Sequence, residues 1–143
     1  YAKRVETLVA LCDLVKVSRA DLEWLYPGRG IEEAAEAWRG LGPHLIVVTL
    51  GADGAMALTA GGKVAVPGRK VQVVDTVGAG DSFHSALLAG LIERGALTHD
   101  RLPKVELDAL RGLLDRAARA AAITCSRAGA NPPTKRELDE AAP

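Results

Sequence analysis

An acidic residue follows two closely spaced glycines in residues 75–83, where the sequence reads DTVGAGDSF. Valines 71, 73 and 74 before this segment predict a strand, and the apolar run of residues 85–92 predicts a helix after it. The glycines would then lie at a helix N-terminus, where backbone N–H groups without helical partners and the helix dipole favour an anion. Asp81, beside such an anion, could accept a hydroxyl proton, as phosphoryl transfer to an alcohol requires.

The same segment has a simpler interpretation as a structural turn, in which Asp81 serves only as the N-cap of the helix. Two other nucleotide motifs are excluded. Phe83 stands where the dinucleotide fingerprint needs its third glycine, and the chain contains no G-x-x-x-x-G-K-[ST] sequence.

The signature of residues 75–81 resembles that of the PfkB, or ribokinase-like, family of carbohydrate kinases. The resemblance covers nearly the whole chain, because further segments follow the family's order at its approximate spacing: residues 14–18, 47–54, 120–122 and 127–130. Residues 16–18 and 78–83 look most similar to bacterial fructokinases. The resemblance implies a three-layer α/β/α fold with a mostly parallel sheet.

A family member of this kind transfers phosphate from ATP to a sugar hydroxyl. By resemblance, Asp81 would be the general base, and the loop of Gly78, Ala79 and Gly80 would form the anion hole. Backbone N–H groups of Ala79, Gly80 and Asp81 would stabilise charge on the transferred group.

The resemblance also implies sites for ATP and for Mg²⁺. The nucleotide's ribose and phosphates would lie beside Thr49, Leu50, Gly51, Ala52, Asp53 and Gly54, with Gly80, Asp81 and Ser18 nearby. Ser18 and Asp21 occupy the positions of the family's Asn-x-x-Glu, whose acid organises Mg²⁺ through water. Asp is one methylene shorter than Glu, so a plain N-cap role for Ser18 is favoured over a metal contact through Asp21.

A potassium site is implied by the same resemblance. At the matching positions of this sequence, its ligands would be Asp75 and the carbonyls of Val77, Thr124, Arg127 and Gly129. Pro133 stands where relatives commonly have a serine, which weakens one ligand. The alternative is that Asp75 simply bonds nearby amides.

Five other residues receive simpler interpretations. Lys16 could pair with a phosphate, but an exposed lysine near a strand end is favoured. His84 is assigned no role, and Trp24 and Trp38 are expected to be core anchors. Ala118 falls where relatives often carry an Asn or His near adenine, so no side-chain contact to the base is expected there.

Apolar periodicity predicts alternating helices and strands. Strands are expected at residues 14–17, 45–50, 55–58 and 64–66, and helices at 21–26, 31–41, 82–94, 107–126 and 134–141. Such alternation indicates an α/β layer architecture that binds ligands at the carboxyl ends of its strands. Residues 18–21, 51–54 and 78–81 are expected to share that edge.

Composition argues against polyanionic partners. Eighteen basic and eighteen acidic residues give a formal net charge of zero, and aromatic residues make up 3% of the 143. No nucleic acid or membrane is therefore expected as a partner. The resemblance instead implies ATP and a small sugar as ligands and allows a homodimer. Cys12 and Cys125 are expected to be reduced core thiols in a cytoplasmic protein.

The chain begins inside an amphipathic pattern, with Val5, Leu8 and Val9 at helical spacing. We expect residues 1–143 to be the nucleotide-binding C-terminal part of a longer kinase. The sugar-binding half and the lid of the family have no counterpart here, so the chain alone is expected to be inactive. A kinase for a nucleoside or another small alcohol, and a nucleotide-binding module without turnover, remain alternatives.

Overall fold

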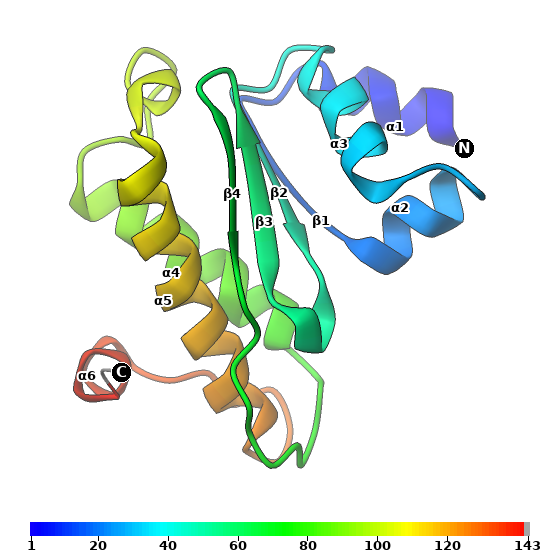
Figure 1. The fold of residues 1–143 in the computed structure, drawn as a ribbon. Helices are drawn as coiled ribbons and strands as arrows, with labels where there is room; N and C mark the ends of the chain where they lie inside the picture. The colour runs from blue at the N-terminus through cyan, green and yellow to red at the C-terminus, as the bar shows by residue number, and fades with distance from the viewer. Residues whose placement is uncertain (142–143) are drawn as a thin grey trace.

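A four-stranded sheet lies between two layers of helices in the computed structural model, which describes residues 1–141 (Figure 1). The strands are β1 (Leu14–Ser18), β2 (Leu45–Thr49), β3 (Ala55–Thr59) and β4 (Gly62–Val66), in the spatial order β1-β2-β3-β4. Strands β1 and β2 are parallel, whereas β2–β3 and β3–β4 are antiparallel. The α/β class is confirmed, but this part of the sheet is mixed rather than mostly parallel. The reason is that short turns join β2 to β3 and β3 to β4, and such turns can join only antiparallel strands.

Helices cover both faces of the sheet (Figure 1). One layer contains α1 (Ala2–Val9), α2 (Arg19–Leu25) and α3 (Ile31–Arg39), and the other contains α4 (Ala79–Glu93) and α5 (Leu107–Cys125). Short 3₁₀ turns occur at η1 (Gly51–Asp53) and η2 (Leu102–Lys104), and α6 (Lys135–Glu140) ends the described chain. Within residues 1–141, no helix is long and apolar enough to span a membrane.

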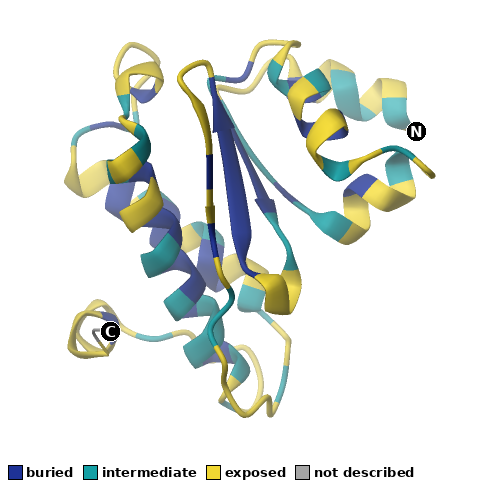
Figure 2. Cartoon of the chain, viewed as in Figure 1, coloured by how far each residue is buried: buried dark blue, intermediate teal, exposed yellow. Residues whose placement is uncertain are grey.

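Strand β2 supplies side chains to both hydrophobic layers. Leu45 and Val47 pack in the core shared with α4 and α5, and Ile46 and Val48 pack in the core shared with α1–α3. This alternation follows from the two-residue period of a strand, and a strand covered on both faces therefore reads as a continuous apolar run. Figure 2 shows the buried stripe along the sheet and along the facing sides of α4 and α5. Each fully buried leucine stabilises the fold by roughly 1.5–3 kcal/mol, so both layers are firmly attached to the sheet.

Three expectations about individual segments are wrong. Residues 67–78 contain no strand, and Val73 and Val74 are each 60% exposed, because the backbone N–H groups of Val74 and Asp75 donate to the Cys125 carbonyl instead of to a strand. Trp24 is 65% exposed, whereas Trp38 is a core residue at 3%. Cys12 is exposed rather than buried in the core.

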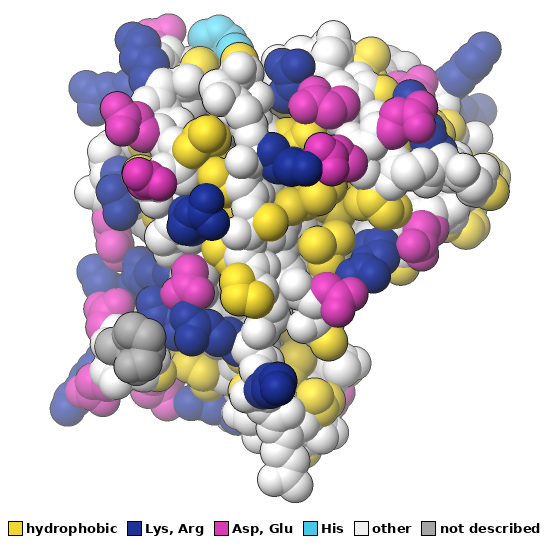
Figure 3. Space-filling model, in the orientation of Figure 1, with side chains coloured by type: hydrophobic (Ala, Val, Ile, Leu, Met, Phe, Trp, Pro, Cys, Tyr) yellow, Lys and Arg dark blue, Asp and Glu magenta, His cyan; other side chains and the backbone are white. Residues whose placement is uncertain are grey.

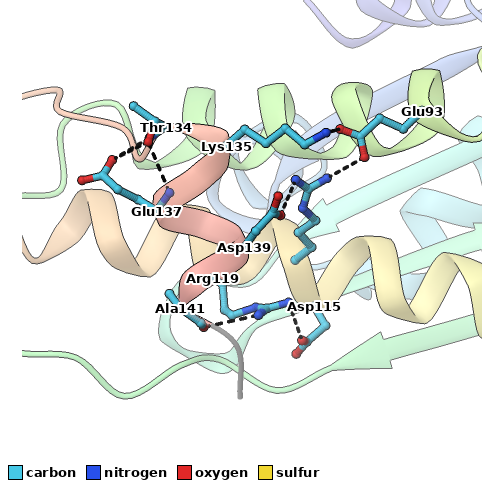
Figure 4. A network of polar contacts seen from close by, with 9 residues as sticks. Glu93, Asp115, Arg119, Thr134, Lys135, Glu137, Asp139 and Ala141 are labelled. Carbon is cyan, nitrogen blue, oxygen red and sulfur yellow. Dashed lines mark hydrogen bonds and ion pairs between the residues drawn. The ribbon is translucent and has the colours of Figure 1, made fainter.

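Polar contacts fix α6 against the helices that carry the core (Figure 4). Arg116 of α5 pairs with Glu93 of α4 at 3.3 Å and with Asp139 of α6 at 3.0 Å. Lys135 also contacts Glu93, at 2.9 Å. Leu138 adds an apolar contact to the same core, so the C-terminal segment is held by both kinds of interaction.

Candidate functional site at the phosphate loop

The N-terminus of α4 is open to a ligand. Gly78 is the N-cap residue, with φ of 77°, and no side chain bonds the first-turn amides. Among the described residues, no backbone carbonyl accepts the N–H groups of Gly80 and Asp81. Ala79 differs from expectation, because its N–H donates to the Thr76 carbonyl at 3.3 Å. Two amides of the predicted anion hole are thus available, and the third is weakly engaged.

Both glycines of this loop lie close to other parts of the chain, and Gly78 is the position that requires glycine. A side chain at Gly78 would place its Cβ 2.9 Å from the Ala130 Cβ, and the positive φ would strain any other residue. A Cβ at Gly80 would lie 3.0 Å from the Nζ atom of Lys16. The loop backbone therefore approaches both the segment after α5 and strand β1.

Asp81 lies in the first turn of α4 and is exposed. Its carboxylate has no hydrogen-bond or ion-pair partner within residues 1–141, so the alternative in which it serves only as an N-cap is wrong. An exposed carboxylate beside available helix amides can accept a proton from a hydroxyl group that approaches the same anion.

Lys16 and His84 complete the charged surroundings of the loop. Lys16 is half-buried on β1 with its ammonium against Gly80, so the expectation of a simple exposed lysine is wrong. Burial and the Lys16 ammonium lower the pKa of His84, and the Asp81 carboxylate opposes this shift. His84 is therefore a neutral imidazole near neutral pH. The sequence alone gave these two residues no common role, because they are far apart in the chain and only the packing of α4 beside β1 brings their charges together.

The N-terminus of α2, at the same edge, is closed by its own side chains. Ser18 accepts the N–H of Asp21, and the Asp21 carboxylate accepts from the Ser18 backbone at 3.4 Å and from its hydroxyl at 2.5 Å. The N-cap role expected for Ser18 is confirmed. The Oδ2 atom of Asp21 is engaged in this capping box, which leaves the Mg²⁺ role of Asp21 without support.

Arg19 links this helix to the turn that follows β2. Its guanidinium donates to the Leu50 carbonyl at 2.5 Å and to the Asp53 carboxylate at 2.6 Å. Through these two hydrogen bonds from Arg19, Leu50 and Asp53 stabilise the 51–54 turn.

A cavity of about 570 Å³ connects the 51–54 turn to the phosphate loop. Of the residues predicted for the nucleotide, Thr49, Gly51, Ala52, Gly54 and Gly80 line it, but Leu50, Asp53, Asp81 and Ser18 do not. Asp81 and Gly78 instead line a neighbouring cavity of about 400 Å³ between α4, α5 and α6. The segments 18–21, 51–54 and 78–81 come together at one edge, because Arg19 bonds the 51–54 turn and this turn shares the larger cavity with Gly80.

Sequence reasoning missed the opposite wall of the larger cavity. Residues of two segments form it: Gly68, Arg69, Lys70, Val71, Val73 and Thr76 from the segment after β4, and Ala121, Ala122 and Cys125 with the predicted Ala118 from α5. The α5 residues are small, which leaves a flat apolar face. Their spacing at i, i+3, i+4 and i+7 was a signal that could have been used, because it places them on one side of the helix.

Two glycines let the chain cross itself beside the cavity. A Cβ at Gly54 would lie 2.0 Å from the Val66 carbonyl oxygen, and one at Gly68 would lie 1.8 Å from the Ala52 carbonyl oxygen. Neither position tolerates a side chain without a backbone shift. These crossings fix the wall of the cavity relative to the sheet.

Asp75 ties the phosphate loop to the segment after α5. Its carboxylate accepts the N–H of Val77 and the N–H of Gly129, each at 3.0 Å. These backbone hydrogen bonds lower the pKa of Asp75, so the group stays anionic. The interpretation in which Asp75 bonds nearby amides is thus observed.

Thr124 anchors α4 to α5 beneath the loop. Its buried hydroxyl lies 2.7 Å from the Ser82 hydroxyl and donates to the Ala120 carbonyl at 3.0 Å. The Thr124 carbonyl accepts the Arg127 N–H at 3.1 Å. Of the five residues predicted to hold potassium, Val77 and Gly129 each donate a backbone hydrogen bond to Asp75, and Thr124 and Arg127 are bonded to each other in the adjoining turn.

Comparison with known proteins agrees with this geometry. The model of the family described as pfkB family carbohydrate kinase matches residues 1–137. A fructokinase of Rhizobium leguminosarum bv. trifolii is 40% identical over 111 residues, which are 78% of this chain and 34% of that protein.

Solved structures give the same result. The fructokinase of Vibrio cholerae O395, with fructose, ADP and calcium bound, superimposes with a TM-score of 0.80 at 31% identity over 97% of this chain and 44% of that one. Aminoimidazole riboside kinase of Salmonella enterica, complexed with aminoimidazole riboside and an ATP analogue, gives 0.79 at 30% identity, over 97% and 45%. The chain therefore spans about a third of the curated relative and less than half of these solved chains.

Proposed function

Because this chain belongs to the pfkB family of carbohydrate kinases, we propose that it forms the nucleotide-binding part of an ATP-dependent sugar kinase, with a fructokinase-like acceptor preference. The observation that carries the proposal is the uncapped N-terminus of α4, with an exposed Asp81 in its first turn and Lys16 against its loop. Phosphoryl transfer needs charge stabilisation and positioning more than covalent chemistry, and this arrangement supplies both.

The cavity between the 51–54 turn and α5 is proposed to hold ATP. Its polar end at Gly80 suits the phosphates, and the flat alanine face of α5 suits the adenine ring. Arg69 and Lys70 line the same cavity. The charge of Arg69 is largely neutralised by Asp115, at 2.6 Å and 2.8 Å, so Lys16 is the better phosphate partner.

The proposed reaction uses Asp81 as the proton acceptor. The sugar hydroxyl attacks the γ-phosphorus as its O–H bond breaks, the proton goes to the Asp81 carboxylate, and ADP leaves. The N–H groups of Gly80 and Asp81 and the ammonium of Lys16 stabilise negative charge on the transferred group. Mg²⁺ bound with ATP would neutralise further phosphate charge.

A potassium ion is proposed beside the loop, near Asp75 and the carbonyls of Val77, Thr124, Arg127 and Gly129. A double mutant of the Vibrio fructokinase is described with fructose, ADP and a potassium ion, which supports this proposal by relationship. The anionic Asp75 already fixes the loop by two hydrogen bonds, and a cation would add positive potential behind the anion hole.

The acceptor is best identified with the full-length protein. A panel of fructose, other hexoses, ribose and aminoimidazole riboside would be assayed for ADP release, with Asp81→Asn as the blank. We expect the highest kcat/KM with fructose. Preference for a riboside would favour the second candidate, which the similarity to aminoimidazole riboside kinase supports. ATP binding without release of ADP for any acceptor would contradict the proposal and indicate a binding module.

A further inference from the structure

Three metal-binding side chains meet at the end of the sheet opposite the phosphate loop. Asp13 precedes β1, His44 precedes β2, and His99 lies in the turn region after α4. One carboxylate oxygen and one ring nitrogen of each histidine all lie within 4.8 Å of one another. Histidine is visible at the top of the molecule in Figure 3, where Figure 1 shows the starts of β1 and β2.

Two of the three groups are held on a rigid frame. The Asp13 carbonyl accepts the backbone N–H of His44 at 2.8 Å and that of Leu45 at 3.2 Å. Immediately afterwards Leu14 pairs with Leu45 in the parallel ladder. The relative positions of Asp13 and His44 are thus set by the sheet itself.

The third group is carried by a hydrogen-bonded turn. The N–H groups of Arg101 and Leu102 donate to the Thr98 carbonyl at 3.2 Å and 2.9 Å, and the Leu102 side chain is buried in the core. His99 lies inside that turn, with its side chain 74% exposed. A turn anchored on both sides keeps the imidazole near the sheet while leaving its rotamer adjustable.

We propose that Asp13, His44 and His99 form a binding site for a divalent transition-metal ion of the Zn²⁺ type. Two imidazole nitrogens and one carboxylate oxygen are a ligand set that Zn²⁺ accepts, with water in the fourth position. Zinc bonds of 2.0–2.2 Å in a tetrahedron place donor atoms about 3.4 Å apart. The Asp13 oxygen lies 2.7 Å from His99 Nδ1 and 3.9 Å from His44 Nε2, so small rotations of exposed side chains would bring both to that separation.

The role of such an ion would be structural. It would link the α4–α5 connection to the start of β1, whereas Ser18 and the proposed phosphate site lie at the other end of that strand. The inference therefore does not depend on the proposed kinase activity.

The test is metal binding by the full-length, untagged protein after removal of metal with a chelator. Zn²⁺ titration by calorimetry near neutral pH is expected to show a single Zn²⁺ bound per chain, and Co²⁺ is expected to give visible absorption bands. Loss of an outer-sphere partner alone typically costs about 10–100-fold in metal affinity, so His44→Ala and His99→Gln should each weaken binding at least that much.

The matched control is His84→Gln, because His84 is the one histidine of the sequence outside the cluster. It should leave Zn²⁺ affinity unchanged, as should Cys12→Ser, which tests the neighbouring thiol. His99→Gln is expected to fold, since its side chain is exposed, and circular dichroism would check this. Absence of Zn²⁺ binding, or binding that both cluster variants retain, would overturn the proposal and leave a simple His–Asp ion pair.

Discussion

The N-termini of α2 and α4 lie at the same edge of the molecule but differ in how their amides are satisfied. Ser18 and Asp21 close α2 with a reciprocal capping box, and Thr134 and Glu137 close α6 in the same way. In contrast, α4 begins at a left-handed glycine without any side-chain cap. Helices α1, α3 and α5 also lack a side-chain cap, so the missing cap alone does not distinguish α4. At α4 the amides of Gly80 and Asp81 have no protein partner among the described residues, and the proposed function uses them to bind an anion.

The largest expected effect concerns Asp81 in the uncapped first turn of α4. In the full-length enzyme, Asp81→Asn should lower kcat by ~10²–10⁴-fold, because it removes the proton acceptor while the anion hole remains. ATP affinity should stay within a few-fold, which separates this role from phosphate binding. Asp108→Asn is the matched control, because Asp108 lies in the first turn of α5 away from the cavity. A variant with most of the original kcat on its best acceptor would disprove the assignment.

The second largest effect concerns the Lys16 ammonium on β1, which faces Gly80 in the first turn of α4. A hydrogen bond to a charged group contributes about 1.5–3 kcal/mol, so Lys16→Met should weaken ATP binding by roughly 10–100-fold. Binding of adenosine, which lacks phosphates, should change little. Calorimetry with both ligands measures the difference, and exposed Lys104→Met serves as the control. Equal losses for ATP and adenosine would show that Lys16 acts on folding rather than on phosphate.

A smaller effect is expected from the monovalent cation. Turnover in K⁺ should exceed turnover in a tetraalkylammonium salt at the same ionic strength, because a cation near Asp75 adds positive potential behind the loop. Asp75→Asn should abolish the difference. Identical rates in the two salts would mean that Asp75 acts only through its hydrogen bonds to Val77 and Gly129.

At α2, which has a capping box, loss of the cap should lower the stability of the protein rather than its activity. Ser18→Ala removes a cap, which costs about 0.5–2 kcal/mol of unfolding free energy, but should leave the kcat of the folded enzyme nearly unchanged. Denaturant unfolding and steady-state kinetics on the same preparation give both numbers. Thr134→Ala at the equivalent position of α6 provides the comparison. A large loss of kcat with Ser18→Ala would show that this end also contacts the nucleotide.

The smallest expected effect is a change in the pKa of His84, which reports on the charges around the first turn of α4. The Lys16 charge holds down the pKa of His84, so Lys16→Met should raise that pKa, although burial keeps it below the ordinary value. Asp81→Asn should lower it, because the carboxylate favours the imidazolium. NMR titration of the His84 ring measures both shifts. An unchanged pKa in both variants would place Lys16 and Asp81 farther from His84 than the structure does.

Local sequence determined much of this molecule. Periodicity gave every helix and all four strands to within a few residues, because apolar spacing and turn residues act over short distances. The glycines and Asp81 identified the loop, and Ser18 identified a cap. The same local reasoning failed for Val71, Val73 and Val74, since an apolar run becomes a strand only where a partner strand is available.

Tertiary structure decided the contacts between distant segments. Lys16 meets Gly80, Gly68 passes the Ala52 carbonyl, and Asp13 bonds His99, although each pair is separated by many residues in the chain. No local pattern encodes such pairs, because they depend on how the sheet and its helical layers cross. The sequence by itself therefore determined which residues could bind phosphate, whereas the fold decided which charges surround them.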